Sequence, residues 1–109
     1  MPDVLYWAAA TDDVDGFLGV LEQVSIEKKL EFSEILQLLS PSGNTLLHVA
    51  VINRCVGNVK LLLYHSPALI LKQNINGDTP LHLALRSGYF EVIILKQHTF
   101  ALGHIKLAC

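Results

Sequence analysis

The chain has 109 residues, of which 51% are hydrophobic and 17% are charged, so it holds enough apolar material for the core of one domain. Its net charge of −2 combines an acidic part, residues 1–34, with a basic part, residues 35–109. We interpret this asymmetry as solvated faces in preference to a docking surface, and we find no basic stripe of the kind that nucleic-acid binding needs.

Cysteine usage and the N-terminal sequence indicate the compartment. Cys55 and Cys109 form no C-x-x-C pair and are too few for a disulfide framework, so we expect free thiols in a reducing environment. The first residues, MPDVL, lack the positive charge and the long apolar core of a secretory signal. No apolar run reaches the roughly 18 residues that cross a bilayer. The expectation is a cytoplasmic chain with no membrane segment.

Residues 1–24 are predicted to form a degenerate pair of helices. Asp3 is the nearest N-cap for the first helix, and Asp12 is expected in the turn between the two helices. The pair is degenerate because it has no Thr-Pro signal at its start. The apolar residues that define it are Leu5, Tyr6, Trp7, Ala8 and Ala9 on the first helix and Phe17, Val20 and Leu21 on the second.

Residues 25–42 are predicted to be a long linker. Leu5 and Leu47, which stand at matching places on successive first helices, are 42 positions apart, whereas a minimal connection would place them about 33 apart. We assign the linker no secondary structure. Its apolar cluster, expected to pack under the next helix pair, consists of Ile35, Leu36, Leu38 and Leu39.

The strongest pattern is an internal repeat. The sequence GNTLLHVA at residues 43–50 returns 34 positions later as GDTPLHLA at residues 77–84. We therefore assign one repeat to residues 43–76, a partial repeat to residues 77–97, and a divergent tail to residues 98–109.

Local signals mark the limits of the helices in both copies. Thr79 is a good N-cap and Pro80 suits the first helical position, so a helix is predicted to begin there. Gly88 is expected to end it, because glycine tolerates the left-handed conformation of a helix C-terminus. In the upstream copy we expect the turn between the helices near Gly57, one residue longer than its counterpart. Residues 66–70, SPALI, are expected to break the second helix and to lie back across the stack.

The TPLH core and its period of about 33 residues resemble the ankyrin-repeat family. The resemblance implies an all-α solenoid of about three stacked helix pairs with β-turn tips, over residues 1–97. The order of the motifs DVDGF, GNTLLH, SPALI and NINGDTPLH is similar to that of plant ankyrin proteins of the accelerated-cell-death type. Those proteins usually carry a longer array followed by a membrane domain, and they are linked to defence and cell-death signalling. This chain departs from them after residue 97.

The departure leaves the last helix pair without a following repeat to cover it. Terminal repeats need a polar outer side, and about three units are needed for a stable stack. Two interpretations follow: the tail caps the last unit, or the chain is a piece of a longer protein. An uncapped apolar end would favour self-association. The apolar tail residues available for a cap are Phe100, Leu102, Ile105 and Leu107.

No catalytic site, metal site or cofactor is predicted, and an enzyme is the least favoured class. His48 and His82 recur at the repeat period, so we expect each ring to hydrogen-bond to adjacent turn backbone and not to a metal. Cys55 has no base or oxyanion partner signalled nearby. Gly16 and Gly19 lie in an apolar run and not in a phosphate-binding loop.

Binding of a protein partner is the predicted function, and no small-molecule substrate is expected. The resemblance implies that turn tips and first helices line a concave surface that holds the partner. Some asparagines of this set are equally well explained as turn formers. The module acts alone or, as the alternative, as the cytosolic piece of a membrane-anchored plant protein in defence or cell-death signalling. The predicted binding residues are Asn44, Ile52, Asn53, Arg54, Ile75, Asn76, Asp78, Arg86 and Ser87.

Overall fold

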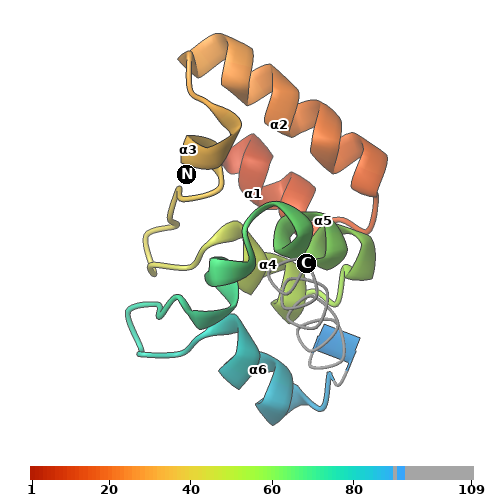
Figure 1. The fold of residues 1–109 in the computed structure, drawn as a ribbon, viewed down its shortest axis with the longest axis vertical. Helices are drawn as coiled ribbons and strands as arrows, with labels where there is room; N and C mark the ends of the chain where they lie inside the picture. Colours follow the sequence, from red (N-terminus) through yellow and green to blue (C-terminus); the bar gives the residue numbers. More distant parts are fainter. Residues whose placement is uncertain (90, 93–109) are drawn as a thin grey trace, which may run out of the picture.

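The computed structural model describes residues 1–89, 91 and 92 (Figure 1). Over these residues the secondary-structure elements are six α-helices and one 3-10 helix. In chain order they are α1 (Asp3–Ala10), α2 (Val14–Lys28), α3 (Phe32–Ile35), α4 (Leu46–Ile52), α5 (Val56–His65), η1 (Pro67–Leu71) and α6 (Pro80–Ser87). Glu91 and Val92 are also helical.

The helices stack as successive pairs, which confirms the predicted all-α solenoid. We name α1 with α2 unit 1, α4 with α5 unit 2, and α6 with the residues that follow it unit 3 (Figure 1). Helix α4 packs against both α1 and α6, and α2 packs against α5, so the units form two columns of helices. Because it lies between two neighbours, α4 buries every residue except Ile52.

Unit 1 forms its helix pair with caps that the sequence did not reveal. Pro2, in an extended conformation, precedes α1, and Asp3 lies in the first turn, where its charge complements the helix dipole. The prediction of Asp3 as N-cap is therefore wrong. Asp13 caps α2, since its side chain accepts a hydrogen bond from the N–H of Gly16 at 3.1 Å. Asp12 does not adopt the left-handed conformation.

The segment interpreted as a linker, residues 25–42, contains secondary structure. Its first four residues complete α2, which ends at Lys29 in the left-handed conformation with φ 54°. At the start of α3, Oε1 of Glu34 accepts a hydrogen bond from the N–H of Glu31 at 3.1 Å. In the predicted apolar cluster, Ile35 and Leu36 are buried in the core, Leu38 is half-buried, and Leu39 is 50% exposed.

Helices α4 and α6 begin in the same way, as the repeated sequence predicts. The hydroxyl of Thr45 accepts a hydrogen bond from the N–H of His48 at 3.3 Å, and Thr79 does the same for His82 at 3.0 Å. Gly88 follows α6 with φ 72°, which confirms the predicted helix stop.

The turn between α4 and α5 differs from the prediction. It lies at residues 53–55, where Arg54 adopts φ 53°, and Arg54 stands 34 positions before Gly88. In both turns the residue after the left-handed position donates a backbone hydrogen bond to the helix before it. The N–H of Cys55 donates to the carbonyl of Ala50 at 3.0 Å, and that of Tyr89 to the carbonyl of Ala84 at 2.9 Å. Gly57 is already the second residue of α5. The expected turn near Gly57 is wrong, and the two turns close at equivalent positions.

The SPALI segment ends the second helix of unit 2, as predicted. Helix α5 stops at His65, and η1 begins at Pro67. Leu69 and Ile70 are buried, and η1 packs against both α5 and α6. The segment therefore fills the space between units 2 and 3.

Asn58 of α5 joins unit 2 to unit 1. Its side-chain amide donates to the carbonyl oxygens of Ala8 at 3.3 Å, Ala9 at 3.0 Å and Thr11 at 2.9 Å. These carbonyls lie at the C-terminal end of α1, where helix carbonyls have no partner within the helix. Asn58 is 1% exposed, and its Oδ1 atom has no partner among the described residues.

Several expectations fall outside the described residues. They concern most of the second helix of unit 3 and the proposed cap formed by residues 98–109. Of that helix, Glu91 and Val92 are described, and Val92 is fully buried. No helix in the described part of the chain is long and apolar enough to cross a membrane.

Candidate protein-binding surface

Two turns project from the stack ahead of α4 and α6. We name residues 40–44 tip 2 and residues 74–78 tip 3. In each tip the N–H of the first residue, Ser40 or Asn74, donates to the carbonyl of the last residue at 2.9 Å. The glycine N–H donates to the carbonyl of the first residue, also at 2.9 Å. Gly43 and Gly77 have φ 75° and 80°, values that glycine adopts without steric cost. The 34-residue period of the sequence is therefore also a period in hydrogen bonding.

The two tips are joined side by side. The N–H of Ile75 donates to the carbonyl of Ser42 at 3.0 Å, and Nδ2 of Asn74 donates to Oδ1 of Asn44 at 2.9 Å. Oδ1 of Asn74 also accepts hydrogen bonds from the backbone N–H groups of Asn76 at 2.9 Å and Asp78 at 3.0 Å. A Cβ atom on Gly43 would lie 3.0 Å from the backbone nitrogen of Ile75, so glycine permits this close approach.

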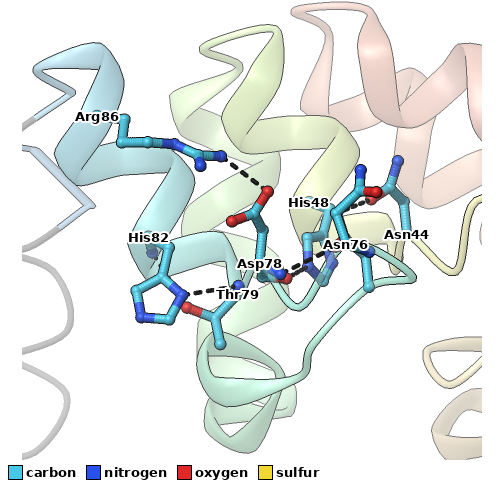
Figure 2. A network of polar contacts seen from close by, with 8 residues as sticks. Asn44, His48, Asn76, Asp78, Thr79, His82 and Arg86 are labelled. Atoms are coloured by element: carbon cyan, nitrogen blue, oxygen red, sulfur yellow. Dashed lines mark hydrogen bonds and ion pairs between the residues drawn. The ribbon is translucent and has the colours of Figure 1, made fainter.

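His48 connects the start of α4 to tip 3 (Figure 2). Its Nδ1 atom accepts a hydrogen bond from the N–H of Thr45 at 3.0 Å, so Nδ1 carries no proton. Its Nε2 atom lies 2.8 Å from the carbonyl oxygen of Asp78 and donates to it. The predicted contact between this histidine and turn backbone is confirmed, and the turn belongs to the next unit.

The environment of His48 favours the neutral ring. Burial is the largest effect and lowers the pKa of His48 below its ordinary value, while the hydrogen bond to the Asp78 carbonyl and the Asp78 charge oppose this effect. His48 is 0% exposed. A proton on Nδ1 would also face the N–H of Thr45, so protonation would break the contact that orients the ring.

The equivalent group in unit 3 is more open. Nδ1 of His82 accepts from the N–H of Thr79 at 3.3 Å, but the His82 side chain is exposed. Beside it, Arg86 forms an ion pair with Asp78 at 2.8 Å, with 63% of the Arg86 side chain exposed (Figure 2). An exposed pair of this kind adds little to stability but holds both side chains in place.

Most of the predicted binding residues have side chains that bond within the protein. Besides the Asp78–Arg86 ion pair, Nδ2 of Asn53 donates to the carbonyl of Val49 at 2.9 Å, and Oγ of Ser87 donates to that of Ala84 at 3.3 Å. The remaining members of this group are Asn44, bonded to Asn74, and Arg54, which donates to the Ser87 carbonyl at 2.7 Å and lies 5.3 Å from the centre of the Tyr89 ring.

Three of the predicted residues keep solvent-facing side chains with no polar contact to the described residues. Ile75 is 74% exposed at the crest of tip 3, Asn76 follows it and is exposed, and Ile52 is 56% exposed at the end of α4. Ile52 lies one helical turn after His48, on the same face of α4. Ile75 and Asn76 together offer an apolar contact beside an amide that can both donate and accept hydrogen bonds, and Ile52 offers a further exposed apolar side chain at the end of α4.

Two exposed features, one on tip 3 and one on unit 1, were not predicted from the sequence. Asn74 organises tip 3 through both ends of its amide, and an asparagine five residues before an N-cap threonine was a signal for that role. Trp7 was assigned only to the first helix, yet it is 67% exposed. A tryptophan at the position where unit 2 has Val49 was the available signal.

The described residues offer little for catalysis or metal binding. Among them, no group of three or more His, Cys, Asp and Glu side chains is placed to hold a metal ion. Cys55 is buried, and burial raises the pKa of its thiol, which disfavours the reactive thiolate.

Two comparisons with known proteins bear on this geometry. Residues 5–98 match the family described as Ankyrin repeats (3 copies). The chain is also similar to Protein ACCELERATED CELL DEATH 6 of Arabidopsis thaliana, with 27% identity over 84 residues. That alignment covers 76% of this chain and 12% of the relative, so the chain spans a small part of that protein's length.

Proposed function

The chain belongs to the ankyrin-repeat family, and from this premise we propose that it binds a protein partner through Ile52, Ile75 and Asn76. Ankyrin repeats are protein-protein interaction modules, so the coarse function follows from the family. Ile75 is the observation that carries the finer proposal. An isoleucine with 74% of its surface exposed has no packing role, and it stands on a tip fixed by hydrogen bonds to its neighbour.

The arrangement reduces the entropic cost of binding. The backbone of tip 3 is already tied to tip 2 and to α4 through Ile75, Asn74 and His48. A partner therefore meets a preformed turn, and ordering of that turn costs little on association. The other predicted residues then act as the scaffold that presents Ile52, Ile75 and Asn76.

The test compares the full chain with an Ile75→Asp variant as baits in an extract of the source cells. Ile26→Asp is the matched control, because Ile26 is 79% exposed but lies in unit 1. Quantitative mass spectrometry should find proteins that the wild type and Ile26→Asp retain and that Ile75→Asp loses. If Ile75→Asp retains the same set as the wild type, the proposed surface is wrong.

A second proposal concerns the process in which the module acts. The relative's name supports a role in the control of cell death in plants, and the 12% coverage supports the view that this chain corresponds to one part of a longer protein. An antibody raised to residues 70–90 would measure the intact mass of the native product. A 12.0 kDa species in the soluble fraction indicates a module that acts alone. A species several-fold larger that sediments with membranes indicates the recognition arm of a longer signalling protein.

A further inference from the structure

Unit 1 has an open hollow on its N-terminal side, away from the tips. It lies between α1 and α2, the red and orange helices of Figure 1, and has a volume of about 290 Å³. Trp7 and Val4 on its rim are 67% and 54% exposed. The apolar and small residues that line it are Val4, Trp7, Ala8, Phe17 and Val20.

Unit 2 shows what normally covers this face. Units 1 and 2 superpose in sequence with an offset of 42 positions, which matches the ends of α1 with α4 and the N-caps of α2 with α5. Val4 and Trp7 then correspond to Leu46 and Val49, which are 0% and 1% exposed. That face of unit 2 is turned toward unit 1, because Asn58, which corresponds to Gly16 of the hollow, donates to the carbonyls of Ala8 and Ala9, and α4 and α5 pack on α1 and α2. The hollow is therefore a stacking face that no unit covers among the described residues.

The shape of the hollow suits a helix. Val4, Trp7 and Ala8 follow the spacing of one face of α1, so they form a stripe along that helix, and Thr11 lines the hollow just beyond the end of α1. The small Ala8 allows close approach, and the floor is the buried ring of Phe17. The elements that pack on unit 2 from this side are themselves helices, α1 and α2. Recognition of an amphipathic helix in an apolar groove is a common mode of peptide binding.

The charge around the hollow selects the kind of helix. The first 22 residues contain five acids and no lysine or arginine. Asp13 lines the hollow directly, and Asp3 immediately precedes Val4. The two basic residues of unit 1, Lys28 and Lys29, lie at the opposite end of α2. Lys28 follows Val20 of the hollow by roughly 12 Å along the helix, at 1.5 Å per residue.

We propose that this hollow binds an amphipathic helix of a partner protein that presents an apolar face flanked by lysine or arginine. The surface is separate from tips 2 and 3, so the proposal does not depend on the function proposed above. In this proposal the acidic charge of residues 1–22 attracts the basic flanks of the partner helix.

Trp7 provides the measurement, because it is the single tryptophan of the chain and lies in the hollow. The probe is a synthetic amphipathic helix of about 18 residues built from leucine, alanine and lysine. Its control has glutamate in place of every lysine. We expect the lysine peptide to shift the Trp7 emission to shorter wavelength and the glutamate peptide to leave it unchanged. The affinity of the lysine peptide should fall as salt is added.

Matched variants test the geometry. Val4→Ser should weaken binding about tenfold, whereas Ile26→Ser on the far part of α2 should have no effect. Asp13→Asn keeps an N-cap residue of similar strength and removes the charge, so binding at low salt should weaken about two- to fivefold. Glu27→Gln is its control, at the other end of α2. Far-UV circular dichroism establishes that each variant is folded.

Three results would overturn the proposal. One is an unchanged Trp7 emission with the lysine peptide, and another is equal affinity for the two peptides. The third is a Trp7 shift that depends on the concentration of the protein alone, together with a dimer in sedimentation that Val4→Ser abolishes. That result would assign the hollow to a second copy of the chain. The tip variant Ile75→Asp should bind the lysine peptide normally, which separates this test from that of the tips.

Discussion

The junction between units 1 and 2 and the junction between units 2 and 3 are held by different interactions. Units 2 and 3 are joined at the tips, through the bond from His48 to the Asp78 carbonyl and the amide pair of Asn44 and Asn74. Units 1 and 2 are joined at the opposite end of the helices, where Asn58 binds the last carbonyls of α1. Tyr6, at the position that corresponds to His48, is 37% exposed. A degenerate repeat thus keeps its place in the stack through a different polar contact.

The largest expected effect comes from His48→Ala, which breaks the second junction. The change leaves the Thr45 N–H without its acceptor, removes one of the two donors to the Asp78 carbonyl and opens a cavity, so we expect the free energy of unfolding to fall by about 3 kcal/mol. His82→Ala, at the exposed equivalent position, should cost less than about 1 kcal/mol. Urea denaturation measures both, and equal losses would contradict the assignment.

Asn58→Ala tests the first junction. The Ala9 carbonyl would lose its donor in a buried site, while the Ala8 and Thr11 carbonyls would each keep one backbone donor, so we expect a loss of about 2 kcal/mol in the free energy of unfolding. Asn53→Ala removes an exposed amide with one backbone bond and should cost about 0.5 kcal/mol. A loss for Asn58→Ala no larger than that of Asn53→Ala would show that apolar packing alone holds unit 1.

The second junction should also depend on pH. Burial lowers the pKa of His48 in the folded state below the ordinary value of 6.5, so the unfolded state binds more protons in the range between these two values. Stability from this group is fully present above pH 6.5 and is lost as the pH falls through the folded-state pKa. Urea denaturation from pH 8 to pH 5 should show a steeper loss for the wild type than for His48→Gln. Parallel curves would contradict the prediction.

The smallest effect concerns Arg54, in the turn of unit 2. Glycine at this position would relieve the left-handed backbone by about 1 kcal/mol, but it would remove the hydrogen bond to Ser87 and the contact with Tyr89, which are worth a similar amount. Arg54→Gly should therefore be within about 0.5 kcal/mol of the wild type. Arg54→Ala keeps the strain and loses the contacts, so thermal melting should show it to be about 1 kcal/mol less stable than Arg54→Gly.

The sequence allowed prediction of the features that depend on local chemistry. Thr79 and Gly88 mark their helix limits because an N-cap and a left-handed stop need particular residue types. The recurrence of His48 at the repeat period indicated its structural role. Gly57 misled the prediction because glycine usually marks a turn, whereas here the tertiary contacts of its neighbour Asn58 keep it in α5.

The candidate surface was less predictable, because its side chains are set by contacts between distant residues. Nothing near Arg54 in the sequence indicates that its guanidinium reaches the carbonyl of Ser87, 33 positions away. Nothing in the local sequence indicates the hydrogen bond between the side chains of Asn44 and Asn74 either, because these residues are 30 positions apart. The side chain of Ile75 has no such partner, and its place on a turn tip, carried over from the resemblance to ankyrin repeats, was sufficient to propose it.

The bond from His48 to Asp78 has a consequence for biosynthesis. The ribosome adds roughly 5–20 residues per second, and the accepting carbonyl lies 30 positions after the histidine, so it is made about 2–6 seconds later. During that interval the nascent second unit has no acceptor for the imidazole proton. Tip 3 therefore completes the polar contacts of unit 2 only after unit 2 itself has been synthesised.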